Sequence, residues 1–327
     1  MLSEPVKTNT LKIRKYTTAD KKVWNELVAK SRNGTFLLNR DYMDYHADRF
    51  TDCSFIFTKK DSVEAILPGN IVDNTFYSHQ GLTYGGLLIS DKVTTIDILE
   101  IFDLLTIELR KLFVTEIIYK PIPFFYHRSP SQEDIYALFR MGAEKIGCNI
   151  SSAIYQSNKL GFNELRKRGV KRGLKSGIQV IESEDFNTFW KILNENLTRK
   201  FGKTAVHSGS EITMLNNRFR NNIRLHVAVL GDDTNSKNIL AGVVTFCTPY
   251  SVHVQYISTT EAGRELGALD LIFYKLINET YANIPVFEFG QSTEHMGKYL
   301  NHNLIFQKEG FGARGVVYDI YKLNVPY

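Results

Sequence analysis

The feature that most constrains the fold of this chain is an order of strands and helices that occurs twice. The second copy runs from Ser251 to Gln291, where alternating side chains predict a strand, a glycine-containing loop follows, and apolar residues at helical spacing predict a helix before a last strand. The first copy repeats this order from Thr75 to Tyr119 at a nearly constant spacing, and two strand-like runs precede each copy. The identity between the copies is slight, so the repeat is one of architecture and not of sequence. We therefore predict two copies of one α/β domain.

The length of 327 residues agrees with a duplication, because it suggests two domains of roughly 150 residues. We expect the first domain over residues 1–155 and the second over residues 156–327, opening with a basic connecting helix at 159–175. That segment, KLGFNELRKRGVKRGLK, holds seven basic residues and one acid, with Arg172 on its basic face. It is either a solvated link between the domains or a surface that binds phosphates or a polyanion.

The composition places the chain among soluble globular proteins. Hydrophobic residues make up 43% and charged residues 23%, and the net charge of +5 is small for this length, so a nucleic-acid partner would need a local basic patch. The cysteines are far apart, which excludes a disulfide framework and gives no metal-binding signature. No apolar run has the length of a signal peptide core or a spanning helix. We therefore expect a cytoplasmic protein with no metal and no membrane insertion.

The loop of the second copy has the features of a phosphate site. A strand, a glycine-containing loop and a helix together aim backbone N–H groups and the positive end of a helix dipole at an anion. Gly263, Arg264 and Gly267 fit such a site, whereas the carboxylates of Glu261 and Glu265 would repel an anion. The alternative is that these glycines serve turn geometry alone.

The two-copy organisation, the basic helix between the copies and the tail GQSTEHMGKYLNHNLIFQKEGFGAR together resemble tandem-GNAT proteins of the Fem type, which are bacterial acyl or aminoacyl transferases. The resemblance is most specific in SHQGLTYGGL, VQYISTTEAGRELGALDLIFYKLI, EFGQST and QKEGFGAR. It implies an α/β fold with two GNAT-like domains, each a mixed and mostly antiparallel sheet flanked by helices. It also implies transfer of an activated acyl group to an amine.

The resemblance suggests acyl-CoA, such as acetyl-CoA, as the donor. GNAT enzymes commonly hold the CoA pyrophosphate with a Gln/Arg-x-x-Gly-x-Gly/Ala loop, and here Arg264 and Gly267 match while Leu269 departs from the pattern. The expected donor site is completed by residues at the end of the strand and at the start of the helix: Tyr256, Ile257, Gly263 and Ala268. Fem-type relatives use aminoacyl-tRNA, so tRNA is the alternative donor, although the modest net charge argues against it.

Two residues are candidates for catalysis. By resemblance, Lys308 in the aromatic-flanked segment FQKEGFG is the donor to the oxyanion, a role that suits a strongly positive group without acceptors; the alternative is an exposed lysine between a turn and a strand. Glu288, in the strand VFEFG, would act as a base or bind the amine, unless it is a buried strand residue with its hydrogen bonds satisfied.

Polar residues on the two equivalent strands and loops are candidates for substrate contact: His79, Tyr84, His253 and Gln255. His207 lies in the segment KTAVHSGSE and is either part of a lid or an ordinary loop histidine. A lone histidine is more often structural than catalytic, so each of these stays an expectation.

The resemblance implies an N-acyltransferase whose second domain holds the donor and whose acceptor is an amine, such as an amino sugar or a nucleotide-linked precursor of a cell-envelope polysaccharide. Two alternatives remain open. One is a Fem-type transferase that uses aminoacyl-tRNA, and the other is a non-catalytic carbohydrate- or nucleotide-binding protein on a duplicated GNAT scaffold.

Overall fold

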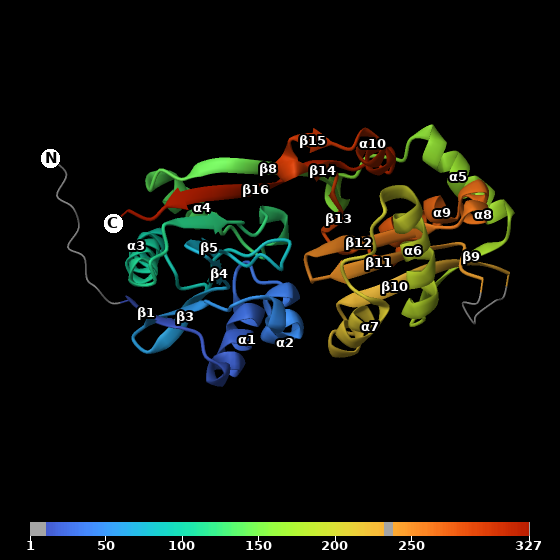
Figure 1. Ribbon diagram of the computed structural model, residues 1–327. Coiled ribbons are helices and arrows are strands. Elements are labelled where there is room, and N and C mark those ends of the chain that lie inside the picture. Colours follow the sequence, from blue (N-terminus) through green and yellow to red (C-terminus); the bar gives the residue numbers. More distant parts are fainter. Residues whose placement is uncertain (1–10, 232–237, 327) are drawn as a thin grey trace. The chain divides into compact units, whose positions relative to one another are not determined.

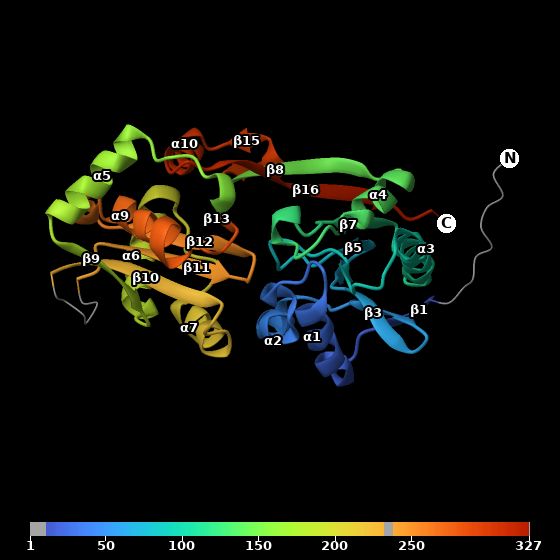
Figure 2. The same cartoon turned by 180° about the vertical axis from the view of Figure 1, so that it is seen from behind.

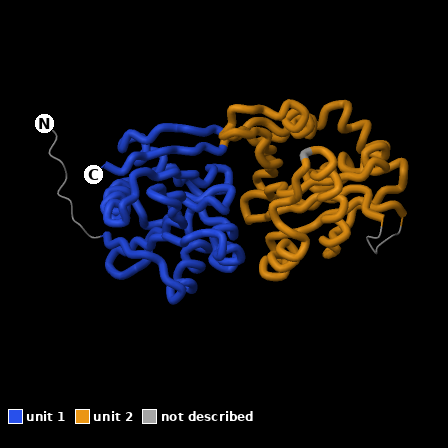
Figure 3. The backbone as a smooth tube through the Cα atoms, viewed as in Figure 1, with its two compact units in different colours: residues 1–148, 318–327 blue, residues 149–317 orange. Residues whose placement is uncertain are grey.

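The computed structural model describes residues 11–231 and 238–326, and the chain divides into two compact units (Figure 3). Unit 1 comprises residues 1–148 and 318–327, and unit 2 comprises residues 149–317. Strands β8 (Glu144–Tyr155) and β16 (Arg314–Asn324) each contribute residues to both units.

Unit 1 is an α/β structure whose strands lie in two groups. Its helices are η1 (Thr18–Asp20), α1 (Lys21–Lys30), η2 (Phe36–Leu38), α2 (Arg40–Met43), η3 (Asp44–Arg49), α3 (Thr95–Lys111), η4 (Phe124–Tyr126) and α4 (Glu133–Arg140). Its strands are β1 (Leu11–Lys15), β2 (Phe55–Lys59), β3 (Ser62–Leu67), β4 (Asn70–Val72), β5 (Thr75–Tyr77), β6 (Leu88–Ile89) and β7 (Glu116–Tyr119), together with the ends of β8 and β16.

The first group of strands in unit 1 is antiparallel, in the order β1-β2-β3-β6. The second has the order β4-β5-β7-β16, in which β5 and β7 are parallel. Helix α3 connects these two parallel strands, as a parallel crossover requires. Thr94 and Asp97 cap its N-terminus reciprocally, and its apolar face packs into the unit 1 core through Ile101, Phe102 and Leu105.

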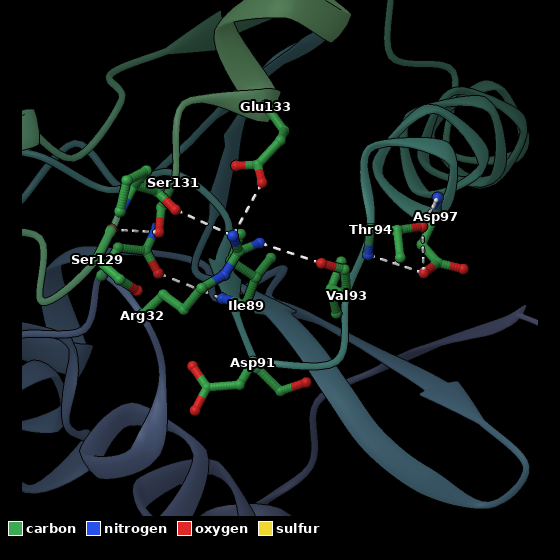
Figure 4. Close-up of polar contacts among 12 residues, drawn as sticks. Arg32, Ile89, Asp91, Val93, Thr94, Asp97, Ser129, Ser131 and Glu133 are labelled. Atoms are coloured by element: carbon green, nitrogen blue, oxygen red, sulfur yellow. Dashed lines mark hydrogen bonds and ion pairs between the residues drawn. The ribbon is translucent and has the colours of Figure 1, made fainter.

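Arg32, which follows α1, holds three segments of unit 1 together (Figure 4). Its guanidinium donates to the carbonyl of Pro130 (3.0 Å), the carboxylate of Glu133 (2.9 Å) and the carbonyl of Val93 (3.2 Å). Its backbone N–H donates to the carbonyl of Ile89 (2.9 Å). The side chain is mostly buried, so this residue serves the fold of unit 1.

Unit 2 is a second α/β structure. Its helices are η5 (Gln156–Asn158), α5 (Glu164–Lys175), α6 (Phe186–Phe201), α7 (Gly209–Arg218), α8 (Glu261–Leu266), α9 (Ala268–Lys275), a π-helical turn η6 (Leu276–Thr280), η7 (His295–Gly297) and α10 (His302–Gly310). Its strands are β9 (Ile178–Ser183), β10 (Ile223–Leu230), β11 (Ala241–Cys247), β12 (Ser251–Thr259), β13 (Val286–Gln291), β14 (Thr293–Glu294) and β15 (Tyr299–Leu300), with the remaining parts of β8 and β16.

The main sheet of unit 2 has the order β8-β13-β12-β11-β10-β9, in which β12 and β13 are parallel. Helices cover both faces. Gly242 on β11 faces Phe189 of α6, whereas the next residue, Val243, packs with Ile272 and Phe273 of α9 in the unit 2 core. Figure 1 shows α6 and α7 in front of these strands, and Figure 2, seen from behind, shows α9 on the opposite face.

The predicted duplication is visible in the register of the two parallel strand pairs. In unit 1, β5 and β7 are in register from Thr75 opposite Glu116 to Tyr77 opposite Ile118. In unit 2, β12 and β13 are in register over the same number of residues, ending with His253 opposite Glu288. The prediction of two similar α/β domains is therefore confirmed.

Two element predictions were wrong in detail. The basic helix begins at Glu164, where Asn163 caps it, so residues 159–163 are not helical. The loop predicted around Gly263 and Gly267 contains the short helix α8, which is capped by the Thr260 side chain. None of the helices within the described residues is long and apolar enough to cross a membrane.

Candidate active site

The candidate site lies in unit 2 where the parallel strands β12 and β13 cease to pair. Their register ends at His253 opposite Glu288. Strand β12 continues to Thr259, and its pairing with β11 shifts between Val244 and Thr245, so that Gln255 is the extra residue of a β-bulge. Bulges re-aim side chains, and this one places polar groups close together at the end of the paired segment.

Glu288 is a fully buried carboxylate that is surrounded by hydrogen-bond donors and positive charge. It accepts hydrogen bonds from the imidazole of His253, the hydroxyl of Ser151 on β8 and the backbone N–H of Gly290, the last at 2.7 Å. Burial alone would raise the pKa of this carboxyl. The nearby His253, its hydrogen bond, the Ser151 hydroxyl and the charge of Lys308 outweigh burial and lower the pKa, so the group is ionised at neutral pH.

His253 is the member of this pair that reaches solvent, since its side chain is 14% exposed and that of Glu288 is not exposed at all. Its Nδ1 faces the Glu288 carboxylate, and its Nε2 lies 3.0 Å from Oε1 of Gln255. A group that touches a substrate here would therefore be His253, with Glu288 orienting the ring.

Lys308 lies on α10 and is buried, so the alternative of an exposed lysine is wrong. Its ammonium donates to the carbonyls of Gly290 (2.7 Å) and Gln291 (2.9 Å) and to the hydroxyl of Ser292 (2.8 Å). Burial lowers its pKa to about 8, and the charge of Glu288 opposes this change. All three N–H donors of the ammonium are directed at the chain segment that follows Glu288, so Lys308 fixes that segment.

Tyr256 and His207 form a second polar pair beside the bulge. The Tyr256 hydroxyl lies 2.5 Å from Nδ1 of His207 and 3.3 Å from its backbone N–H. Trp190 of α6 packs edge-on against the Tyr256 ring and donates its indole N–H to the carbonyl of His207 (2.8 Å). Burial raises the pKa of Tyr256, so its hydroxyl is protonated at neutral pH. The neighbouring Ile257 packs against the unit 2 core.

The predicted phosphate loop is tightly packed. A Cβ at Gly263 would lie 2.1 Å from the carbonyl oxygen of Leu240, and a Cβ at Gly267 would lie 2.2 Å from that of Gly169 on α5. Gly267 also has a φ of +77°, which favours glycine. The glycines thus serve close packing and turn geometry, while Arg264 on α8 is exposed and Ala268 is buried.

Helix α5 occupies the space next to the start of α9. Its Arg166 pairs with Asp270 of α9 at 2.8 Å, and Gly169 leaves room for that carboxylate. Burial raises the pKa of Asp270 despite this ion pair. Arg172 lies on the opposite, exposed face of α5 with other basic side chains, which are Arg168, Lys171 and Lys175.

The two candidates of the first unit are buried within unit 1. Tyr84 donates its hydroxyl to Thr35 (3.0 Å). His79 packs against His46 and Phe50 with a φ of +67°, and burial lowers its pKa to about 3. Both residues make their contacts inside the fold of unit 1.

The structure therefore brings His253, Gln255, Glu288 and Lys308 into one cluster, with Tyr256 and His207 beside it. It adds the hydroxyls of Ser151 and Ser292 and the backbone of Gly290, which sequence analysis missed. A signal was present for Ser292, which lies in the specific motif EFGQST, but β8 with Ser151 was not predicted as a strand. Within 11–231 and 238–326, no group of three His, Cys, Asp or Glu side chains is arranged to hold a metal ion.

Comparison with known proteins finds similar structures and no similar sequence. No protein family and no curated protein matches the chain. The crystal structure of FemX aligns with a TM-score of 0.68 at 12% identity, over 94% of this chain and 96% of FemX. L-PGS from Bacillus licheniformis aligns with a TM-score of 0.58 at 10% identity, over 94% of this chain and 90% of that one.

A tandem GNAT protein from the clavulanic acid biosynthesis pathway aligns with a TM-score of 0.51 at 11% identity, over 97% of this chain and 99% of that protein. At these identities the likeness is one of fold. The chain thus has the tandem-GNAT fold of the Fem type, as the sequence resemblance predicted.

Proposed function

We propose that this protein is a transferase that moves an acyl or aminoacyl group from an activated donor to an amine, and that unit 2 carries the reaction. The observation that supports this most is the His253–Glu288 pair, placed where β12 and β13 cease to pair. A buried carboxylate behind a partly exposed imidazole is a base held in one orientation. The fold is shared with a protein named as a putative lysylphosphatidylglycerol synthetase from Agrobacterium fabrum, which by analogy of fold favours group transfer over simple binding.

In the proposed reaction, the amine nitrogen attacks the carbonyl carbon of the donor, a C–N bond forms, and the bond to the carrier breaks. The proton that the amine loses goes to His253, and the Glu288 carboxylate stabilises the imidazolium. The leaving carrier takes up a proton from the site. Lys308 supports this geometry by holding Gly290, Gln291 and Ser292, and its positive charge favours the ionised form of Glu288.

Unit 1 lacks the corresponding base, which is why we assign the reaction to unit 2. Tyr77 and Ile118 occupy the places of His253 and Glu288. The chain after β5, which contains Gly81, Gly85 and Gly86, crosses the equivalent position. The backbone N–H of Gly85 donates to the carbonyl of Lys120 at 3.0 Å, and a Cβ at Gly85 would lie 1.7 Å from the carbonyl oxygen of Ser78. His79 and Tyr84 are buried in the core of unit 1, so we assign them to the fold of that unit and not to substrate contact.

For an acyl-CoA donor, we propose that the acyl arm lies along β12 at Tyr256 and Ile257 and that Arg264 meets a phosphate. Arg264 is exposed on α8 close to the start of α9, where a helix dipole favours anions. For this acyl-CoA reaction, the acceptor class that we propose is an amino sugar or another amine of an envelope precursor.

One observation favours aminoacyl-tRNA as a second candidate donor. The contact of Gly267 with Gly169, together with the Arg166–Asp270 pair, fills the space beside the first turn of α9 where a CoA diphosphate would lie. The exposed face of α5 carries Arg168, Lys171, Arg172 and Lys175, and clustered positive charge suits a nucleic-acid backbone.

The test is a binding and transfer experiment with the full-length protein. Thermal shift and calorimetry measure the binding of acetyl-CoA, longer acyl-CoAs and UDP-amino sugars. A separate assay measures transfer of the aminoacyl group from charged tRNA. Stabilisation by acyl-CoA that is lost in Arg264→Ala but kept in Lys191→Ala, an exposed control on α6, supports the CoA donor. Transfer from charged tRNA without a CoA response supports the second candidate. Binding of a UDP-amino sugar with no transfer from either donor contradicts the transferase proposal.

A further inference from the structure

Lys120 follows the parallel pair β5 and β7 in unit 1, at a place equivalent to the candidate site of unit 2. The register of this pair ends at Ile118, as the register of β12 and β13 ends at Glu288. Lys120 therefore stands two residues beyond the last pair, where Gly290 stands in unit 2. In open α/β sheets, ligands bind beyond the carboxyl ends of parallel strands. This end of β7 is thus a place to look for a ligand of unit 1.

The turn after β5 fixes the position of Lys120. The backbone N–H of His79 donates to the carbonyl of Tyr77 (2.7 Å), and His79 has a φ of +67°, so the chain turns sharply after the strand. The hydroxyl of Ser78 accepts the backbone N–H of Lys120 (2.8 Å). The loop that follows brings the carbonyl of Leu82 to the Lys120 ammonium, which donates to it at 2.5 Å. The ammonium is therefore held in a defined place.

The Lys120 ammonium has fewer acceptors than donors. An ammonium has three N–H groups, and within the described residues the Leu82 carbonyl is the one acceptor that Lys120 contacts through them. Lys308 in unit 2, by comparison, has an acceptor for each of its three N–H groups. Two donors of Lys120 are therefore available to a ligand.

Lys120 also has no negative charge beside it. In residues 11–231 and 238–326, no carboxylate forms an ion pair with its ammonium. Burial lowers the pKa of Lys120 to about 8 with no charge opposing it, whereas the charge of Glu288 opposes the same change in the pKa of Lys308. The neighbouring His79 is neutral, since burial lowers its pKa to about 3. A partly buried cation in such surroundings is stabilised by an anion that comes from outside the chain.

We propose that Lys120 is the binding residue of an anion site in unit 1, which takes the phosphate or carboxylate group of a small-molecule ligand. The oxygens of either group can accept the two remaining N–H groups and supply the missing negative charge. Gly81 and Thr83, on either side of Leu82, are exposed, so the loop that meets the ammonium lies at the surface. This site goes beyond the proposed function, which assigns no ligand to unit 1.

The direct test is NMR of the full-length protein with lysine labelled at Cε, whose chemical shift reports the charge of each ammonium. The Lys120 signal is assigned from Lys120→Arg. Titration with inorganic phosphate or with acetate, at constant ionic strength, should raise the pKa of Lys120 by about 1 or more in a saturable way, because a bound anion favours the ammonium. The exposed Lys22 on α1 is the internal control.

The two anions distinguish the two ligand groups. The anion that saturates the Lys120 response at the lower concentration identifies the preferred group, and the uncharged sugar N-acetylglucosamine should give no response. A Lys120 signal that responds to neither anion in a saturable way, or that responds as Lys22 does, overturns the proposal. The readout comes from the native protein, so it decides the question even where a variant does not fold.

Substitution tests the same site by affinity. Lys120→Gln keeps an N–H donor for the Leu82 carbonyl but removes the charge, so calorimetry should show the preferred anion bound about tenfold to a hundredfold more weakly than by the native protein. The matched control, Lys22→Gln, should bind it as the native protein does. Equal affinity of Lys120→Gln and the native protein overturns the proposal. Neither measurement uses an acyl donor, so the anion site stands or fails independently of the transferase proposal.

Discussion

Gly267, in the turn before α9, meets Gly169 of α5 backbone to backbone: a Cβ on Gly267 would lie 2.2 Å from the carbonyl oxygen of Gly169. Backbone atoms on both sides leave no flexible group that can move aside. The glycine that resembles part of a phosphate loop is therefore needed for packing, whatever the donor is. A charged or bulky substitution there would disturb the fold as well as any ligand site.

Gly267→Ala should therefore destabilise the protein in the absence of any ligand. The new methyl group clashes with Gly169, and the φ of +77° is unfavourable for alanine, so we expect a loss of about 2–4 kcal/mol in the free energy of unfolding. Urea unfolding measures it. Gly161→Ala is the control, because a Cβ at Gly161 meets nothing within 4 Å. Equal stability of the two variants would show that α5 does not pack against this turn.

Glu288→Gln should lower turnover while leaving the fold intact. The amide keeps the shape of the side chain but cannot stabilise an imidazolium on His253, so we expect kcat to fall about a hundredfold with little change in KM. The measurement is steady-state kinetics with the donor identified by the transfer assay. Glu279→Gln, which removes an exposed partner of Lys275, is the control. A change in KM alone would place Glu288 in substrate binding and remove it from the support of a base.

The sequence predicted much of the fold because the repeated pattern depends on local spacing. The period of the apolar residues is enough to indicate strand, helix and strand in both copies. Nothing in the sequence indicates that β8 and β16 contribute to both units, because long-range pairing leaves no local pattern. The same limit explains the missed Ser151, whose role depends on β8 lying next to β13 with Ser151 opposite Gln291.

The site was predicted in part for a related reason. Residue type pointed to Glu288 and His253, since ionisable groups in or beside an apolar strand are unusual. Lys308 was predicted from the resemblance alone. Spacing could not reveal that Gly263 and Gly267 are covered by the backbones of Leu240 and Gly169, because packing from distant segments decides whether a glycine loop is open.

Lys308→Met should destabilise unit 2 and change how stability depends on pH. Methionine fills a similar space but leaves the acceptors on Gly290, Gln291 and Ser292 unsatisfied, which costs roughly 2–4 kcal/mol at pH 7. The folded pKa of about 8 lies below the ordinary 10.5, so the unfolded chain binds the proton more tightly between these values and the native protein gains stability as pH rises through them.

The variant lacks this gain, so the stability difference between native protein and Lys308→Met should widen between pH 8 and about 10.5. Urea unfolding across this range measures the stability difference. Lys298→Met, which replaces an exposed lysine, is the control. A difference that stays constant or narrows with pH would mean that Lys308 titrates normally in the folded protein.

His79→Asn should make unit 1 more resistant to acid. Burial lowers the folded pKa of His79 to about 3 from the ordinary 6.5, so below pH 6.5 the unfolded chain takes up a proton that the folded chain does not, and stability is lost as pH falls. At pH 5 this amounts to about 2 kcal/mol, which the variant should recover relative to its stability at pH 7.5. Asparagine also tolerates the φ of +67° at this position.

Unfolding at both pH values measures this change in stability, with His302→Asn as the exposed control. If His79→Asn and the native protein lose the same stability between pH 7.5 and 5, the His79 ring is accessible to protons in the folded state.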